Sequence, residues 1–245
     1  MDLTLDDLKL GLRSMFYMVS QKELDENGAE LITKATPWFF TFIVAEFIVG
    51  KLRGHRTYRL NDGMASLSQG MVSEQTKLWG RSAFLVLYQE TYAQYGLRLF
   101  NDPQSFEAFL FGMIAVDFFY YWFHRFSHEF HFAFSQHSGH HTGEDYNLAT
   151  ALRQGALQWL LGMAFTLPLA VFIPPVSLFA HFFANTVAQF WFHTCQIGSL
   201  GPLEYILNTP SHHRMHHRPP GNCNVSQKVC LCVGLTLTLS STAES

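Results

Sequence analysis

An apolar run of seventeen residues leads directly into the most histidine-rich part of the chain. The run, EAFLFGMIAVDFFYYWF, covers Glu107–Phe123, and the next eighteen residues, HRFSHEFHFAFSQHSGHH at His124–His141, hold six histidines. A second cluster, SHHRMHH at Ser211–His217, follows about seventy residues later. Ten of the thirteen histidines lie in these two windows, so the fold must place apolar helices beside a polar site that is rich in imidazoles.

Three apolar segments are candidates for helices in or at a membrane. A spanning helix needs about 20 predominantly apolar residues, a length that Ala35–Gly50 reaches with Leu31–Thr33 added and that Glu107–Phe123 approaches. Ala83–Phe100 is interrupted by glutamine and glutamate, which predicts a tilted or half-buried helix. Charged residues make up 14% of the chain, against about 25% in a soluble domain. A mean hydropathy of only +0.06 indicates a substantial water-facing portion as well.

Two further apolar segments, Gly155–Ile173 and Val176–Phe192, flank Pro174 and Pro175. Proline cannot continue a helix, so the pair predicts a helical hairpin with its turn at the prolines. Because a hairpin crosses a membrane twice, both histidine clusters then lie on the same side. The positive-inside rule assigns that side to the cytosol, because these residues flank it: Lys51, Arg53, Arg56, Arg59, Arg125, Arg153, Arg214 and Arg218.

These patterns predict an all-α polytopic membrane protein with about four to five membrane helices and a cytosol-facing, histidine-rich di-metal site. The alternative is a soluble helical protein whose apolar runs are core helices of about ten to fourteen residues. A net charge of −3 and a pI near 6.5 give no support for nucleic-acid binding, and no obligate protein partner is evident. The four cysteines form no CxxC pair, which predicts neither a disulfide scaffold nor a zinc–thiolate site.

Four polar residues share one side of the helix that is expected to end the third span. At about 100° per residue, Tyr121, His124 and His128 lie within about 40° of Asp117. Polar residues inside a membrane protein usually serve its function. This stripe therefore carries two imidazoles from the apolar phase into the polar one. Asp117 and Tyr121 are expected to orient metal ligands, with a solvated helix edge as the alternative.

Two triplets of the form H-x-x-H-H complete the histidine pattern. They are His137-x-x-His140-His141 and His213-x-x-His216-His217. On a helix, positions i, i+3 and i+4 share a face, so each triplet can offer three imidazoles to one centre. Eight histidines are too many for one first-row ion and suit two. The zinc-protease pattern is excluded because no glutamate follows His124, and the remaining alternative is a structural or adventitious zinc site.

The three motifs, in this order, resemble those of the fatty acid hydroxylase and sterol desaturase superfamily, whose members are membrane-bound non-haem di-iron oxygenases. The resemblance covers Leu31–Asn222 and is most specific in Val116–Glu129, Glu144–Gln154 (EDYNLATALRQ) and Gly201–His217 (GPLEYILNTPSHHRMHH). The last two stretches are similar to the ether-cleaving branch, the alkylglycerol (glyceryl-ether) monooxygenases. The expected parts are a polar N-terminal segment at 1–30, a membrane and catalytic domain at 31–222, and a divergent tail at 223–245 without family motifs.

The resemblance implies an endoplasmic reticulum membrane enzyme that uses O2 and tetrahydrobiopterin to hydroxylate the ether-bearing carbon of a 1-O-alkylglycerol. The product, a hemiacetal, falls apart to a fatty aldehyde and glycerol. Glu129 matches a glutamate required in this branch, and it is expected to handle the pterin or to support the metal site. Imidazole suits zinc, copper, nickel and iron alike, so iron is implied by the resemblance alone. By analogy, two iron ions are bound by His124, His128, His137, His140, His141, His213, His216 and His217.

The other polar residues of these stretches divide into candidates and bystanders. His193 lies at the end of the second hairpin helix and is a candidate ninth ligand, with a capping or supporting role as the alternative. His131 is expected at the interface, His181 in the core, and His212 about 100° away from its ligand neighbour. His55 lies in a loop and is uninformative. The candidates for contact with the pterin or a glycerol head group are Asn147, Arg153 and Asn208.

Two other functions stay open at this point. One is a hydroxylase or desaturase of the same superfamily that acts on a fatty acyl chain or a sterol, with electrons from cytochrome b5 instead of the pterin. The other is a truncated, catalytically inactive membrane protein, because the tail replaces a segment that follows the last ligand triplet in the family. EDYNLATALRQ favours the ether-cleaving activity over the first alternative.

Overall fold

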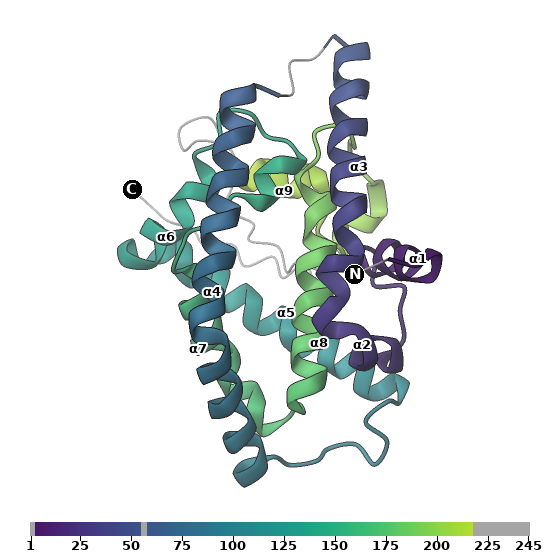
Figure 1. The fold of residues 1–245 in the computed structure, drawn as a ribbon, viewed down its shortest axis with the longest axis vertical. Coiled ribbons are helices and arrows are strands. Elements are labelled where there is room, and N and C mark those ends of the chain that lie inside the picture. Colours follow the sequence, from purple (N-terminus) through teal and green to yellow (C-terminus); the bar gives the residue numbers. More distant parts are fainter. Residues whose placement is uncertain (1–2, 55–57, 218–245) are drawn as a thin grey trace.

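The computed structural model describes residues 3–54 and 58–217, and every regular element within these ranges is helical (Figure 1). The expected all-α class is therefore confirmed for the described residues. The tail at 223–245, Arg218, His55 and Arg56 lie outside them. The α-helices are α1 (Leu5–Ser14), α2 (Gln21–Asn27), α3 (Leu31–Leu52), α4 (Leu60–Tyr95), α5 (Phe106–Glu129), α6 (His131–His141), α7 (Gln158–Thr166), α8 (Pro175–Gln189) and α9 (Pro210–His216). The 3-10 helices are η1 (Gly28–Glu30), η2 (Leu148–Leu152), η3 (Leu167–Val171), η4 (Phe190–His193) and η5 (Gly201–Tyr205).

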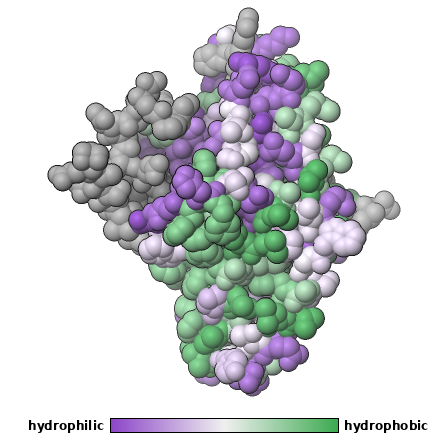
Figure 2. Space-filling view, turned by 90° about the vertical axis from the view of Figure 1, so that its left-hand side faces the viewer, coloured by the Kyte–Doolittle hydropathy of each residue, from purple (hydrophilic) through white to green (hydrophobic). Residues whose placement is uncertain are grey.

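Two helical stretches, Gln21–Leu52 and Phe106–Glu129, are long and apolar enough to cross a membrane. The first contains α3 and the second is α5, so both strongest candidates from the sequence form helices where expected. On the face that carries α6 and α7, apolar residues gather over the middle and lower part of the molecule, and polar residues lie at its top and again at its lowest end (Figure 2). Large apolar side chains also stand exposed on the two candidate spans: Phe40, Val44, Phe47 and Ile48 of α3, and Ile114, Phe118 and Trp122 of α5.

Helix α4 is longer than the sequence indicates and ends earlier. It covers Leu60–Tyr95, whereas the apolar pattern predicts a helix only over Ala83–Phe100. Its first half carries apolar residues at helical spacing, at Leu60, Met64, Leu67 and Met71, and the helix packs against η2 and α7. At Gly70 and Gly80 the packing leaves no room for a side chain: an added Cβ would lie 2.6 Å from the Leu152 carbonyl oxygen and 1.9 Å from the Trp159 ring.

The predicted hairpin forms, with its break at the two prolines. Pro174 caps α8 and Pro175 is its first residue, a position where the missing N–H costs nothing. The first arm is shorter than Gly155–Ile173, because α7 begins at Gln158 and tightens into the 3-10 helix η3 at Leu167. Pro168, which has no N–H to donate, lies at this change of helix type.

Helix α8 is the centre of the bundle and packs against α2, α3 and α5. Most of its residues are buried, among them Leu178, Phe183 and Val187. His181 is fully buried on α8, with its Nε2 atom 2.8 Å from Gln21 Oε1, as expected for a core histidine. Because α8 runs on into η4, it delivers His193 to the place where α5, α6 and α9 meet.

Candidate metal centre

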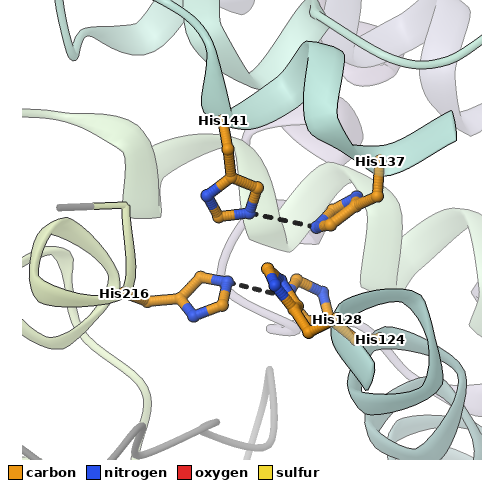
Figure 3. A group of neighbouring side chains, drawn as sticks. All are labelled: His124, His128, His137, His141 and His216. Atoms are coloured by element: carbon orange, nitrogen blue, oxygen red, sulfur yellow. Dashed lines mark hydrogen bonds between the residues drawn. The ribbon is translucent and has the colours of Figure 1, made fainter. Parts of the chain in front are cut away.

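Five imidazoles from α5, α6 and α9 surround one point in the described part of the chain (Figure 3). One ring nitrogen from each lies within 4.8 Å of all the others. We call these residues the five-histidine group; its members are His124, His128, His137, His141 and His216.

Four more imidazoles form a second group beside the first. It draws on α6, η4 and α9, and its ring nitrogens also lie within 4.8 Å of one another. We call these residues the four-histidine group; its members are His140, His193, His213 and His217. The structure thus brings together all eight histidines of the three sequence motifs and adds His193.

Local helix signals place these side chains. The Ser105 side chain caps α5 by accepting a hydrogen bond from the Ala108 N–H at 3.2 Å. Thr209 caps α9, and Pro210 follows as its first residue. Phe130 has an extended backbone between α5 and α6, so the chain turns there. His131 consequently starts α6 and is exposed, and it does not continue the stripe of α5.

Each triplet is divided between the two groups, which differs from the expectation that one triplet serves one centre. His137 and His141 belong to the five-histidine group, whereas His140 belongs to the other. In α9, His216 and His217 are separated in the same way. Positions i and i+4 differ by about 40° around a helix, but neighbouring residues differ by about 100°. The i, i+4 pairs therefore stay together and the adjacent pairs split.

The nitrogen spacing fits metal ions. In the five-histidine group the Nε2 atoms of His124 and His216 are 2.8 Å apart, and those of His137 and His141 are 3.1 Å apart. In the four-histidine group the His193 Nε2 atom lies 3.0 Å from that of His213. Two nitrogens bound at right angles to an ion about 2.1 Å away lie about 3.0 Å apart.

Hydrogen bonds at the outer ring nitrogens fix the tautomers. His140 Nδ1 lies 3.0 Å from the Arg153 carbonyl oxygen, and His193 Nδ1 lies 3.1 Å from the Gln189 carbonyl oxygen. A carbonyl oxygen only accepts, so both Nδ1 atoms carry the hydrogen. In the neutral rings both Nε2 atoms then present lone pairs to each other at 3.2 Å. A cation between them converts this repulsion into binding, and so the donor set fits a metal.

Protonation of an imidazole would also relieve the repulsion between facing nitrogens, but these histidines are not protonated near neutral pH. Burial, followed by the neighbouring imidazoles, lowers the pKa values of His137, His193, His213 and His217. Burial likewise lowers the pKa of His140 to about 4 and that of His216 to about 3. These rings are therefore neutral, which is the form that binds metals.

Gln158 is a supporting residue that the sequence patterns miss. Its Oε1 atom lies 3.4 Å from His137 Nδ1, and it is buried at the start of α7. Metal-bound imidazoles commonly donate their second N–H to such a partner. Its sequence position, at the start of a hairpin helix, does not by itself predict a contact with a metal ligand.

The residues of the α5 stripe that were expected to orient ligands have the following contacts among the described residues. Asp117 is buried and accepts a hydrogen bond from Asn185 Nδ2 at 3.3 Å, which links α5 to α8. The Tyr121 hydroxyl accepts from Arg125 at 3.4 Å. Arg125 also donates to the Glu129 carboxylate at 2.7 Å, and the Glu129 side chain is 52% exposed. Glu129 therefore points to the rim of the site.

Two of the three candidates for contact with the pterin or a head group, Asn147 and Arg153, have structural contacts. Asn147 is buried and caps η2, with its side chain accepting from the Ala149 N–H at 3.0 Å. Arg153 is buried in an ion pair with Asp62. Asn208 is buried, and its Oδ1 atom has no hydrogen-bond partner among the described residues. His212 Nε2 lies 3.8 Å from the Glu204 carboxylate and outside both histidine groups.

The sequence matches known proteins over the same region. The fatty acid hydroxylase family model matches residues 109–232. The chain is 43% identical over 217 residues to the alkylglycerol monooxygenase of Homo sapiens, an alignment that covers 84% of this chain and 47% of that protein. The alkylglycerol monooxygenases of Xenopus tropicalis (40% identity; 84% and 47% covered) and Caenorhabditis elegans (35%; 87% and 43%) match similarly. The chain thus spans about half the length of these curated relatives. No solved structure matches it.

Proposed function

The chain belongs to the fatty acid hydroxylase family, and on that premise we propose that it is a membrane-bound di-iron monooxygenase that cleaves the ether bond of 1-O-alkylglycerols. The observation that carries the proposal is the pair of histidine groups, in which Nε2 atoms of neutral rings face one another at 2.8–3.2 Å. The identity to alkylglycerol monooxygenases supports the choice of substrate.

Nine histidines would hold the two ions. The five-histidine group binds one iron and the four-histidine group binds the other, with His193 as the ninth ligand. Bound iron supplies the activation of O2 against an unactivated C–H bond, which side chains alone cannot perform. The protein keeps the imidazoles neutral by burial and fixes their orientation through Gln158 and the carbonyl oxygens of Arg153 and Gln189.

The proposed reaction balances with tetrahydrobiopterin as the reductant. One oxygen atom of O2 enters the C–H bond of the ether-bearing carbon and the other leaves as water, while the pterin gives up two electrons and two protons and becomes a dihydropterin. The hemiacetal so formed loses its alkoxy group and yields a fatty aldehyde and glycerol. Glu129 is proposed to meet the pterin and not a metal ligand, because its carboxylate is half exposed and pairs with Arg125 at the rim.

We place the enzyme in the endoplasmic reticulum membrane, with four to five membrane helices and the histidine groups on the cytosolic side. The two long apolar stretches and their exposed apolar side chains support the membrane location. Lys51 and Arg53 end α3, and basic residues at the end of a span favour the cytosol.

The test is fatty aldehyde release from a 1-O-alkylglycerol by membranes that contain the chain, supplied with Fe(II) and tetrahydrobiopterin. Aldehyde should form only with the pterin, should vanish in His140→Ala, and should persist in the control His131→Ala, whose side chain is exposed on α6. Aldehyde formation that needs no pterin, or that survives in His140→Ala, would contradict the proposal. Turnover of an acyl chain or sterol with cytochrome b5 would replace it with the other hydroxylase activity.

A further inference from the structure

Two of the buried carboxylates outside both histidine groups come from α3 and α4, the two longest helices before α5. Glu46 on α3 is 4% exposed and Asp62 on α4 is 9% exposed. Burying a carboxylate is unfavourable unless hydrogen bonds or ion pairs replace its contacts with water. The hydrogen-bond partners of the two carboxylates therefore indicate what role these residues have in the fold.

Glu46 joins three separate segments. Its Oε1 atom accepts from Thr194 Oγ1 at 2.5 Å and from the Cys195 N–H at 3.1 Å. Its Oε2 atom accepts from the Tyr58 hydroxyl at 2.5 Å and from the Leu148 N–H at 2.8 Å. Thr194 and Cys195 directly follow His193, so Glu46 fixes the backbone on which that imidazole stands.

Asp62 acts on the other side through Arg153. Its Oδ1 atom pairs with Arg153 at 2.8 Å, and the same guanidinium donates to the Gly139 carbonyl oxygen at 2.8 Å. The carbonyl oxygen of Arg153 in turn accepts from His140 Nδ1 at 3.0 Å. Asp62 also receives the backbone N–H groups of Glu144 and Asp145 at 3.4 and 3.5 Å.

Both acids therefore hold one continuous segment, Glu144–Gln154, which we call the strap. Asp62 contacts its beginning and its end, and Glu46 contacts its middle at Leu148. Asp62 is linked to His140 through Arg153 of the strap. Glu46 is linked to His193 through the next two residues, Thr194 and Cys195. These two imidazoles face each other in the four-histidine group.

We propose that Glu46 and Asp62 are positioning residues that clamp the strap and thereby set the metal affinity of the four-histidine group selectively. The inference rests on the proposed metal centre, and it adds that the two histidine groups are supported by different residues. The five-histidine group has its own support, because Gln158 on α7 contacts His137. The strap is on this account a structural element, and Asn147 and Arg153 serve it instead of meeting a pterin or a head group.

The test is titration of the purified full chain in detergent with Co(II), whose visible absorption reports each site, together with metal content per chain. His193→Ala and His128→Ala provide the reference spectra for loss of the four- and five-histidine ions. Glu46→Ala and Asp62→Ala should weaken one ion ten- to a hundredfold, the range seen for outer partners of metal ligands. The weakened ion should be the one lost in His193→Ala.

Two further variants keep the result interpretable. Glu46→Gln retains the shape and one carbonyl acceptor, so it should weaken the same ion by less than Glu46→Ala does, and it serves if the alanine variant does not fold. Tyr88→Phe removes a buried hydrogen bond to the Ile173 carbonyl oxygen, at 2.9 Å, away from both groups. It should bind both ions as the wild type does.

The outcomes separate the clamp from the metal centre. Equal weakening of both ions, weakening only of the five-histidine ion, or unchanged affinities in folded Glu46 and Asp62 variants would overturn the clamp. Wild-type chain that binds no Co(II) and no Fe(II) would overturn the metal centre itself, and the clamp with it.

Discussion

The Nε2 atoms of His140 and His193 face each other at 3.2 Å while both Nδ1 hydrogens are donated to backbone carbonyl oxygens. Fifty-three residues separate the two histidines, so only the tertiary fold creates this pair. Neither ring can donate from Nε2, and burial keeps His140 neutral by lowering its pKa. The two Nε2 lone pairs therefore already face the position that a cation would take.

His193→Ala is expected to lower the metal content from two ions to one per chain and to reduce aldehyde formation by more than about tenfold, because loss of an outer partner alone costs that much. The measurement is metal analysis of purified protein alongside the aldehyde assay. His212→Ala is the control, since that ring lies outside both groups. Two ions in His193→Ala would exclude His193 as a ligand.

Gln158→Leu should weaken metal binding by the five-histidine group about ten- to a hundredfold, because His137 loses the acceptor for its Nδ1 hydrogen. Competition with a chelator at pH 7 measures the change. Gln154→Leu is the matched control, because the Gln154 side-chain amide donates to the Ala151 carbonyl oxygen, at 3.2 Å, and not to an imidazole of the described residues. Equal affinities in the two variants would show that His137 needs no such partner.

Arg153→Ala should destabilise the fold by about 3–5 kcal/mol, since it leaves the Asp62 carboxylate buried without its partner. Denaturant unfolding of the metal-free chain in detergent gives the free energy. Lys9→Ala removes an ion pair with Asp6 whose side chains are 60% and 90% exposed, and such a pair contributes at most about 1 kcal/mol. A loss in Arg153→Ala as small as that in Lys9→Ala would contradict the account.

Gly155→Ala should destabilise the chain by about 1–3 kcal/mol, the usual cost of overpacking. An added Cβ there would lie 1.8 Å from the Gln136 carbonyl oxygen, next to His137. Gly63→Ala in α4 meets nothing within 4 Å and should be neutral or stabilising by up to about 1 kcal/mol. Thermal unfolding of the two variants distinguishes them, because only Gly155→Ala is expected to lower the melting temperature; an equal loss in both variants would contradict this account.

Glu204 should make the stability depend on acid pH. Burial raises its pKa, but hydrogen bonds from the Leu200 N–H and the Ser211 hydroxyl outweigh burial and lower the pKa to about 2. A carboxylate with a lowered pKa stabilises the fold above its unfolded value, near 4.5, and this contribution is lost as pH falls toward 2.

The measurement compares the free energy of unfolding of metal-free chains with and without Glu204→Gln between pH 7 and pH 3. Both chains carry His212→Gln, because the His212 Nε2 atom lies 3.8 Å from the Glu204 carboxylate. The stability difference should be constant above about pH 4.5 and shrink below it. A difference that does not change with pH would show that Glu204 is not selectively stabilised as a carboxylate.

Sequence patterns predicted those parts of the fold that depend on neighbouring residues along the chain. The stripe on α5, the break at Pro174 and Pro175, and the helices that carry the triplets all follow from helical spacing and proline chemistry. The long apolar runs likewise predicted α3 and α5. The division of the triplets also follows from the 100° step between neighbouring residues, but only once a second helix is known to face the first.

What the sequence could not predict depends on contacts between distant segments. Glu46 looks like an interruption in an apolar span, and its partner Thr194 lies 148 residues away. Asp62 meets Arg153 across 91 residues. The first half of α4 does carry a local signal, because Leu60, Met64, Leu67 and Met71 follow helical spacing, but its packing against η2 depends on a distant segment. A single acid in a helix carries no spacing signal, so its role becomes visible only in the tertiary structure.

Two dipeptides, His140-His141 and His216-His217, each place one ring in each histidine group. The two groups are therefore joined twice by a single peptide unit, whose Cα atoms are about 3.8 Å apart. That covalent length does not change when side chains repack. A shift of α6 or of α9 therefore carries a ring of each group with it, so the two groups cannot move along the fold independently of each other.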